Sequence, residues 1–379
     1  MSRREAEETV SGKMTIQKLH ETDRLAENEE RIRQITGKIL PPDEETEQAA
    51  RLRWDGMGKP LGSLGKLEDA VVQIAGVTRS PEVSVEKKAL VVFCADNGVV
   101  AEGISQCGSE VTATVAENFL DGKSCAAILC RKAGADLFPV DIGMAVDTPR
   151  VEKRKIAYGT KNMAIEPAMT REQAAAAVRV GMQKACELRE AGYRILAAGE
   201  MGIGNTTVGS AMTAVLLGVP AEEVTGRGAG LSSEGLERKI RVIRRAIDLH
   251  RPDPADPFDV LAKVGGFDIA GMAGLFLGGA CCGIPVVMDG FLSSVAALTA
   301  VRIAPACAPY ILASHVSGEP AARRLLDALG KEAFLTCDMR LGEGSGAAAL
   351  FPLLDMAVEV YRKMSSFSEA GIEPYRPLK

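Results

Sequence analysis

Five glycine-rich segments place small polar or charged residues where a loop could hold a ligand. A single loop of this kind is usually only a tight turn. Five of them in one chain favour a binding site that is built from several loops. They are residues 59–69 (KPLGSLGKLED), 95–103 (ADNGVVAEG), 199–207 (GEMGIGNTT), 226–235 (GRGAGLSSEG) and 339–347 (MRLGEGSGA).

The last segment contains the pattern G-x-G-x-x-A at Gly342, Gly344 and Ala347, which is typical of a dinucleotide-binding loop. Such a loop opens a strand–helix–strand unit, whereas here only about 30 residues follow it. Glu343 lies inside the loop, where a carboxylate would repel a phosphate. We therefore interpret Glu343 as a proton acceptor, and a nicotinamide-dependent oxidoreductase is the weaker alternative.

Glu200 ends a strongly apolar segment, so burial should raise the pKa of its carboxyl group. A carboxyl group tuned in this way can act as a general acid or base. The alternative is that Glu200 accepts backbone N–H groups of its own loop. His315 also follows an apolar segment and is more often a structural residue in such a place. The ambiguity of Glu200 applies as well to the aspartates near other apolar segments, Asp96, Asp141, Asp268 and Asp289.

The segment 226–235 could hold a phosphate at the N-terminus of a helix, with Ser232 or Ser233 as the cap. Lys239 lies two turns into that helix and could add a positive charge. A capped surface helix with a solvated lysine explains the same residues.

Short apolar runs alternate with helical patterns from residue 90 onward, which predicts an α/β protein with a parallel sheet. We expect helices at 171–190, at 233–250 and from about 345, and a linker or surface loop at 252–259. Ligands of such sheets bind beyond the carboxyl ends of the strands. The predicted strands are 89–95, 135–141, 194–200, 284–290 and 309–315.

The composition is that of a globular enzyme, with 46% hydrophobic and 25% charged residues in 379. A net charge of -5 disfavours nucleic-acid binding. The nine cysteines form no Cys-x-x-Cys pair and predict free thiols in a cytoplasmic protein without a metal site. The first 14 residues have no apolar run, and the apolar stretches are too short for a membrane span.

Together these segments resemble the nicotinate-nucleotide–dimethylbenzimidazole phosphoribosyltransferase family, over residues 59 to 372. Seven blocks occur in the family's order. They are LGSLGKLED, CADNGV, AGEMGIGNTT, KVGGFDIAGMAG, VVMDGFLSSVAAL, IAPACAPYILASH and MRLGEGSGAA.

The resemblance implies a three-layer, Rossmann-like α/β domain at about 89–345. It also implies a smaller helical domain made of 51–88 and about 346–379. Residues 1–50 are rich in charged residues with apolar positions at helical spacing, which predicts a helical extension in which Met14 is an alternative start. The family's substrates are nicotinate mononucleotide and an aromatic base, and its members need no cofactor. The expected assembly is a homodimer, with a heterodimer of two related chains as the alternative.

The resemblance also assigns roles to residues of this chain. Glu343 matches the catalytic base, and Glu200 matches the second carboxylate near the reaction centre. The expected positions around the nucleotide and its phosphate are Gly202, Asn205, Thr206, Gly228, Lys239, Ser317 and Gly342.

The expected base pocket contains Asp96, Cys107, Val115 and Leu341. Members that use benzimidazoles have a serine and, eight residues later, a glutamine where this chain has Cys107 and Val115. Losing a hydroxyl and an amide removes hydrogen-bonding discrimination between bases. The expected base is therefore 5,6-dimethylbenzimidazole or an analogue, with phenolic or purine bases as alternatives. A non-catalytic partner subunit is a further alternative, which the presence of both glutamates disfavours.

Overall fold

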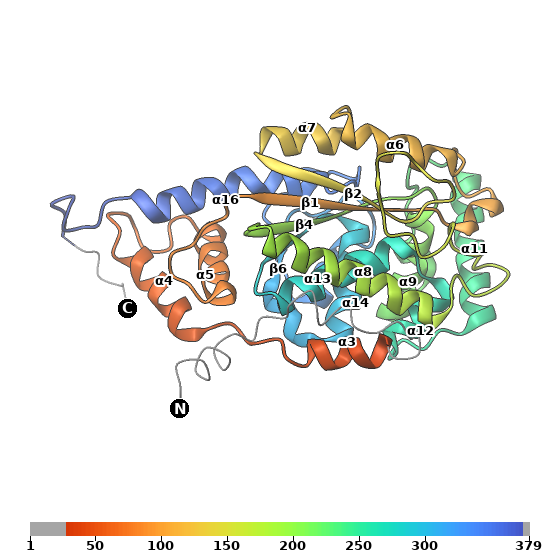
Figure 1. Cartoon of the computed structure of the whole chain (residues 1–379), viewed down its shortest axis with the longest axis horizontal. Coiled ribbons are helices and arrows are strands. Elements are labelled where there is room, and N and C mark those ends of the chain that lie inside the picture. Colours follow the sequence, from red (N-terminus) through yellow and green to blue (C-terminus); the bar gives the residue numbers. More distant parts are fainter. Residues whose placement is uncertain (1–27, 374–379) are drawn as a thin grey trace.

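A six-stranded parallel sheet forms the centre of the computed structural model, which describes residues 28–373 (Figure 1). The strands lie in the order β3-β2-β1-β4-β5-β6. The α/β fold with a Rossmann-like parallel sheet that the sequence predicted is confirmed. The strands are β1 (Lys88–Ala95), β2 (Ala135–Gly143), β3 (Glu152–Lys153), β4 (Ile195–Met201), β5 (Val286–Met288) and β6 (Ile311–Ala313).

All five predicted strands are present, with β5 and β6 shorter than expected. The sequence did not predict β3, because two residues are too few to produce a pattern. Lys88 at the start of β1 is opposite both Ala135 and Ile195, the first residues of β2 and β4. The three central strands therefore begin at one level, and their carboxyl ends meet at one edge of the sheet.

Helices cover both faces of the sheet, which gives three layers (Figure 1). Val91 and Phe93 of β1 belong to one apolar core, and Leu90 and Val92 belong to the other, because successive side chains of a strand point to opposite faces. The first core contains α8 (Arg171–Glu190), α9 (Asn205–Leu217), α11 (Ser233–His250), α12 (Pro257–Val264), α13 (Phe267–Cys281) and α14 (Phe291–Ile303). The second contains α5 (Lys66–Thr78), α6 (Glu110–Leu120), α7 (Cys125–Lys132) and α16 (Ser345–Lys363).

Helices α8 and α11 have the bounds that the sequence predicted, and Ser232 caps α11 by accepting the N–H of Gly235 at 3.1 Å. The prediction of a loop over 252–259 is wrong at its end. Helix α12 begins at Pro257, which suits the first helical position, and Asp256 caps it. The short helices are α10 (Ala221–Val224), α15 (Ala322–Leu329) and the 3-10 helices η2 (Gly98–Glu102) and η3 (Pro305–Tyr310).

Cys186 in α8 and Cys282 at the end of α13 form a disulfide, so the prediction that all nine thiols are free is wrong. The two residues are 96 positions apart, and their Cα atoms lie 6.0 Å apart. Spacing along the chain gave no indication of this pair, because it is the packing of α8 on α13 that brings the two side chains together. The other seven cysteines are free.

Two helices precede the sheet in the described part of the chain, α3 (Asn28–Thr36) and α4 (Glu44–Asp55). Helices α4 and α5 lie beside the end of α16 (Figure 1), where the rings of Trp54 and Tyr361 are 5.1 Å apart. The division into an extension and two domains stays a prediction. Met14 and the rest of residues 1–27 lie outside the described residues.

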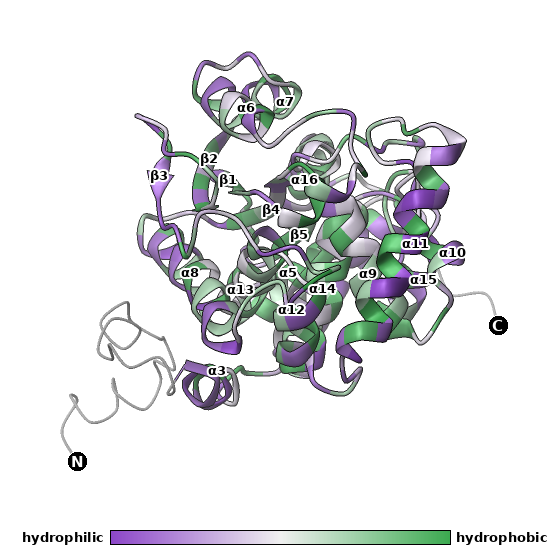
Figure 2. Cartoon of the chain, turned by 90° about the vertical axis from the view of Figure 1, so that its right-hand side faces the viewer, coloured by the Kyte–Doolittle hydropathy of each residue, from purple (hydrophilic) through white to green (hydrophobic). Residues whose placement is uncertain are grey.

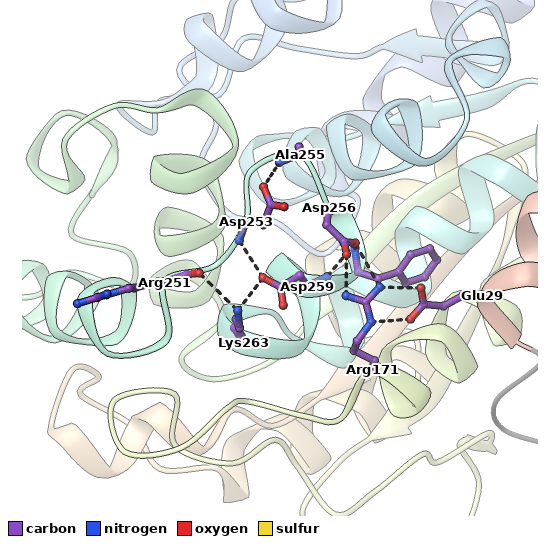
Figure 3. Close-up of polar contacts among 9 residues, drawn as sticks. Glu29, Arg171, Arg251, Asp253, Ala255, Asp256, Asp259 and Lys263 are labelled. Carbon is purple, nitrogen blue, oxygen red and sulfur yellow. Dashed lines mark hydrogen bonds and ion pairs between the residues drawn. The ribbon is translucent and has the colours of Figure 1, made fainter.

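Arg171 joins α3 to the α/β part of the molecule (Figure 3). Its guanidinium group binds Glu29 of α3 and Asp256 at the start of α12, each at 2.7 Å. Asp256 also accepts the N–H groups of Phe258 and Asp259. Helix α3, which belongs to the predicted N-terminal extension, is therefore docked against the layer that contains α8 and α12.

Apolar residues gather on the helices next to the sheet, such as α13 and α14, whereas α3 at the margin is largely hydrophilic (Figure 2). Within residues 28–373, no helix has the length and apolarity to cross a membrane.

Glycines let α8 and α13 approach each other closely. A Cβ added at Gly181 of α8 would collide with the carbonyl oxygen of Gly271 and would lie 2.6 Å from the N atom of Leu275. A Cβ added at Gly274 of α13 would collide with the carbonyl oxygen of Val178. Backbone atoms cannot give way as a flexible side chain can, so these positions admit only glycine.

We expect Gly181→Val to lower the free energy of unfolding by about 3 kcal/mol, because the added carbons overfill a closed helix–helix contact. Urea denaturation followed by circular dichroism measures the change. The matched control is Ala176→Val, a partly exposed position of the same helix, which should cost much less. Equal stability of the two variants would contradict the close contact.

Candidate active site

The candidate site lies where the order of the sheet changes direction. The chain runs from β1 to β2 and β3 on one side, and then returns through β4 to β5 and β6 on the other. The switch point is therefore between β1 and β4, where a parallel sheet leaves room for a ligand beyond the strand ends. Asp96 follows β1 directly, and Glu200 is the second-last residue of β4.

A cavity of about 300 Å³ opens at this switch point. A narrower recess of about 40 Å³ adjoins it and shares several of its walls. The residues that line both are Glu200, Thr206, Leu292, Glu319, Arg340 and Leu341.

Glu343 reaches the cavity from a loop in an unusual conformation. The φ angles of Gly342, Glu343 and Gly344 are 87°, 61° and 79°, so three consecutive residues are left-handed. A left-handed glutamate is uncommon and is typical of a functional position. Burial raises the pKa of the Glu343 carboxyl group, and the N–H of Ala126 donates to it at a long 3.4 Å. The group is therefore suited to accept a proton.

The end of β4, which carries Glu200, lies against the loop that carries Glu343. A Cβ added at Gly199 would lie 2.8 Å from the carbonyl oxygen of Glu343, and one at Gly342 would collide with the carboxyl group of Glu200. The backbone N–H of Glu343 also bonds to that carboxyl group. Glycine at both positions therefore allows the two glutamates to share one site.

The environment of Glu200 keeps its carboxyl group neutral. Burial and the negative charge of Asp268 raise its pKa to about 8. The side-chain amide of Asn205 bridges the two acids, because it donates both to Glu200 and, at 3.0 Å, to Asp268. Burial raises the pKa of Asp268 to about 6. Near pH 7, Glu200 is a protonated acid.

Lys239 lies at the other end of the cavity and is 1% exposed. Its ammonium group donates to the hydroxyl of Thr206 at 2.8 Å and to the carbonyl oxygen of Gly226 at 3.1 Å. Burial lowers its pKa to about 8. A Cβ added at Gly228 would lie 3.5 Å from its nitrogen, so the backbone approaches the ammonium group closely. The N-terminus of α9, at Asn205, lines the same cavity and attracts anions.

Most of the predicted site residues come together here. Ser317 and Gly342 line the narrow recess. Leu341 lines both spaces, as does Glu200. The predicted residues that line the larger cavity are Val115, Glu200, Gly202, Asn205, Thr206, Gly228, Lys239, Leu341 and Glu343.

Two residues of the predicted base pocket do not line either space. Cys107 is exposed on the loop before α6. Asp96 is buried, where it accepts the hydroxyl of Thr112 at 2.6 Å and the N–H of Ala145 at 2.7 Å. Asp96 therefore holds the ends of neighbouring loops together.

Two glycine-rich segments also lie outside the cavity walls. Gly62, Gly65 and Glu68 of the segment 59–69 line a separate cavity of about 260 Å³ beside Trp54. Asn97 of the segment 95–103 contacts a residue of the cavity wall, because its amide donates to the carbonyl oxygen of Ile203 at 3.3 Å.

The sequence did not single out the charged residues Arg227, Glu319 and Arg340, which line the cavity. Arg340 precedes Leu341 within a segment already marked for its glycines, so a charge beside a glycine loop was an available signal. Glu319 follows Ser317 by two residues, and nothing in its local pattern distinguished it from a surface glutamate.

Known proteins share this sequence and fold over nearly all of the chain. The family described as "Phosphoribosyltransferase" matches residues 39–372. The nicotinate-nucleotide–dimethylbenzimidazole phosphoribosyltransferase of Acetivibrio thermocellus is 50% identical over 327 residues, which cover 86% of this chain and 93% of that protein. The protein of that name from Ruminiclostridium cellulolyticum is 49% identical, over 88% of this chain and 96% of its own length.

Solved structures agree with the sequence comparison. The crystal structure of CobT from Thermus thermophilus is 40% identical, has a TM-score of 0.83 and covers 87% of this chain and 99% of that one. A structure of the nicotinate-nucleotide–dimethylbenzimidazole phosphoribosyltransferase from the same organism gives a TM-score of 0.82 at 39% identity, with the same coverage. This chain therefore belongs to the nicotinate-nucleotide–dimethylbenzimidazole phosphoribosyltransferase family.

Proposed function

We propose that this enzyme transfers the phosphoribosyl group of nicotinate mononucleotide to an aromatic base, with Glu343 as the general base. The observation that carries the proposal is the meeting of Glu343 and Glu200 in one cavity at the sheet's switch point. The products are nicotinate and the α-ribazole 5′-phosphate type of nucleotide. The non-catalytic subunit is disfavoured, because the cavity holds both glutamates and a buried lysine.

The reaction breaks the bond between C1′ and the nicotinate nitrogen and forms a bond from C1′ to a nitrogen of the incoming base, or to the hydroxyl oxygen of a phenolic one. The base attacks from the opposite face, so the configuration at C1′ inverts. Nicotinate leaves with the bonding electrons, which neutralise the positive charge of its ring. The N–H proton of the incoming azole moves to Glu343, and the ionised glutamate also stabilises positive charge on the ribose, as a carboxylate does in glycosidases.

Glu200 suits the complementary role of a neutral hydrogen-bond donor to the nucleotide. Burial and the charge of Asp268 raise the pKa of Glu200, so that it can remain protonated in a cavity that it shares with Glu343. Environments that push the pKa values of two acids apart are typical of acid–base pairs in active sites.

We assign the phosphate of the nucleotide to the end of the cavity that contains Lys239, Gly228 and Thr206. Lys239 uses two N–H groups within the protein, which leaves the third for a ligand. The N-terminus of α9, which lines the same cavity, adds the positive end of a helix dipole. Ser317 and Gly342, which line the recess, are assigned to the ribose side of the nucleotide.

The incoming base fits against an apolar wall. Val115 lies in this wall and offers no hydrogen bond, whereas discrimination between similar bases depends on buried polar partners. We infer that the enzyme accepts 5,6-dimethylbenzimidazole together with analogues, which include purine or phenolic bases. The apolar residues of the wall are Ile104, Val115, Met201, Ile203 and Leu341.

We further propose that the enzyme is a cytoplasmic homodimer that acts without a cofactor. Fractionation of cells and sedimentation of the pure protein test the compartment and the assembly. A stable complex with a second, related chain would favour the heterodimer instead.

The variant Glu343→Gln should reduce kcat by about 10²–10⁴-fold, because it removes the proton acceptor and keeps the shape of the side chain. Release of nicotinate, measured by chromatography, reports the rate. The control Glu166→Gln changes an exposed glutamate in the same way and should keep full activity. Wild-type turnover in Glu343→Gln would refute the assigned base.

A competition assay tests the base range. We expect benzimidazole and adenine to compete with 5,6-dimethylbenzimidazole for nicotinate mononucleotide, because Val115 offers no hydrogen bond that would exclude an analogue. Mass spectrometry identifies the nucleotides formed when the three bases and p-cresol are supplied in equal amounts. Exclusive use of 5,6-dimethylbenzimidazole would reject the inferred range.

The raised pKa of Glu200 predicts how stability depends on pH. The folded protein keeps a proton on Glu200 up to about pH 8, whereas the unfolded chain releases it near the ordinary value of 4.5. The contribution of this group to the free energy of unfolding is fully present below pH 4.5 and is lost as pH rises to about 8. Because Gln does not titrate, Glu200→Gln should gain stability relative to wild type across that interval.

Urea denaturation at about pH 5 to 9, a range that spans most of this interval, measures the difference. Glu166→Gln again serves as the control and should follow the wild-type curve at every pH. A constant difference between Glu200→Gln and wild type across the interval would show that Glu200 is ionised in the folded protein.

A further inference from the structure

Asp289 lies between the sheet and the loop that carries Glu343. It follows β5 directly and is 4% exposed. Its own backbone is held on both sides: its N–H donates to the hydroxyl of Ser293 at 3.1 Å, and its carbonyl oxygen accepts the hydroxyl of Ser314 at 3.1 Å. The position of its side chain is therefore set by the sheet and by α14.

The carboxylate of Asp289 accepts three backbone N–H groups at the start of α16. Oδ1 accepts Gly346 at 2.7 Å and Ala347 at 3.0 Å, and Oδ2 accepts Gly344 at 3.2 Å. The first N–H groups of a helix have no partner within it. The residue at the cap position, Gly344, has no side chain that could supply one. Asp289 therefore caps α16 from a different element of the fold.

One of the three bonds acts directly on Glu343. The N–H of Gly344 belongs to the peptide unit that follows Glu343, so its direction is determined by the ψ angle of Glu343. The bond to Oδ2 of Asp289 thus fixes this angle in a residue whose φ is 61°. A glutamate leaves the left-handed region readily unless surrounding contacts hold it there.

We propose that Asp289 is a positioning residue for the transfer reaction, because it holds the backbone of Glu343 in the conformation that directs its carboxylate into the cavity. This inference rests on the proposed role of Glu343 as the base. It assigns a function to an aspartate whose place at a strand end allowed only an ambiguous interpretation from the sequence.

His315 supports this arrangement from the next strand. Its Nδ1 lies 3.8 Å from Oδ1 of Asp289 and 3.0 Å from the hydroxyl of Ser314. A Cβ added at Gly346 would collide with the His315 ring, so the start of α16 packs directly on the imidazole. Asp289, His315 and the first turn of α16 therefore form one packed junction beneath the catalytic loop, and Asp289 and His315 also line the narrow recess.

The variant Asp289→Asn tests the proposal. Asparagine has the same shape, and its carbonyl oxygen can keep the bonds to Gly346 and Ala347. Its NH2 group then faces the N–H of Gly344, where donor meets donor. We expect kcat to fall by about 10²-fold, as for other misplacements of a reacting group. The KM for nicotinate mononucleotide should change less than about threefold, because binding groups elsewhere in the cavity are untouched.

A double variant separates positioning from a purely structural role. If Asp289 acts through Glu343, then Asp289→Asn should add no further loss of kcat to an enzyme that already carries Glu343→Gln. An equal additional loss in both backgrounds would overturn the proposal, as would wild-type kcat in the single variant. Failure of the proposed base is a separate result, since Glu343→Gln alone would then remain fully active.

The matched control is Asp256→Asn, which changes another carboxylate that caps a helix (Figure 3) and that lines neither the cavity nor the recess. It should lower the melting temperature without changing kcat. Asp289→Ser, whose hydroxyl can cap a single N–H group, is the second variant and should show the same loss of kcat. If neither Asp289 variant folds, Asp289 serves the stability of the junction and the positioning role is rejected.

Discussion

The site depends on one close contact, between the end of β4 and the loop of Gly342, Glu343 and Gly344. A side chain at Gly199 would collide with the backbone of Glu343, and one at Gly342 would collide with the carboxyl group of Glu200. The contact brings a strand of the sheet's centre against a segment near the end of the chain, and each contributes one glutamate. Because a parallel sheet collects its strand ends at one edge, the fold can join such distant segments without long loops.

The binding of an anionic substrate depends on buried groups in the cavity more than on the net charge of the chain. The chain carries a net charge of -5, and yet an anionic substrate needs positive potential. Lys239 and the N-terminus of α9 supply it locally, inside a cavity where low polarity strengthens each interaction. The same burial keeps Glu200 neutral, so that an acid and a carboxylate can lie together. Burial thus strengthens the interactions of Lys239 and at the same time sets the charge state of Glu200.

The sequence predicted the elements that have strong periodicity and the residues that belong to distinctive loops. Strands β1, β2 and β4 and helices α8 and α11 are long enough to show their pattern, whereas the two residues of β3 are not. Glu343 and Glu200 were identifiable because a carboxylate in a glycine loop or at a buried strand end is chemically unusual. The disulfide of Cys186 and the wall residue Glu319 were not, since both depend on contacts between elements that no local pattern reports.

The left-handed conformation of Glu343 is stable because the hydrogen bonds to Asp289 contribute more free energy than this conformation costs. A left-handed residue costs about 1–2 kcal/mol, whereas a hydrogen bond to a charged group contributes about 1.5–3 kcal/mol. Asp289 makes three such bonds to the backbone around Glu343. Those N–H donors favour the ionised form of Asp289 and so oppose the effect of burial, which raises its pKa. Glu343 accepts one long bond, from Ala126, and therefore keeps its basicity. Positioning and proton acceptance are in this way divided between two carboxylates.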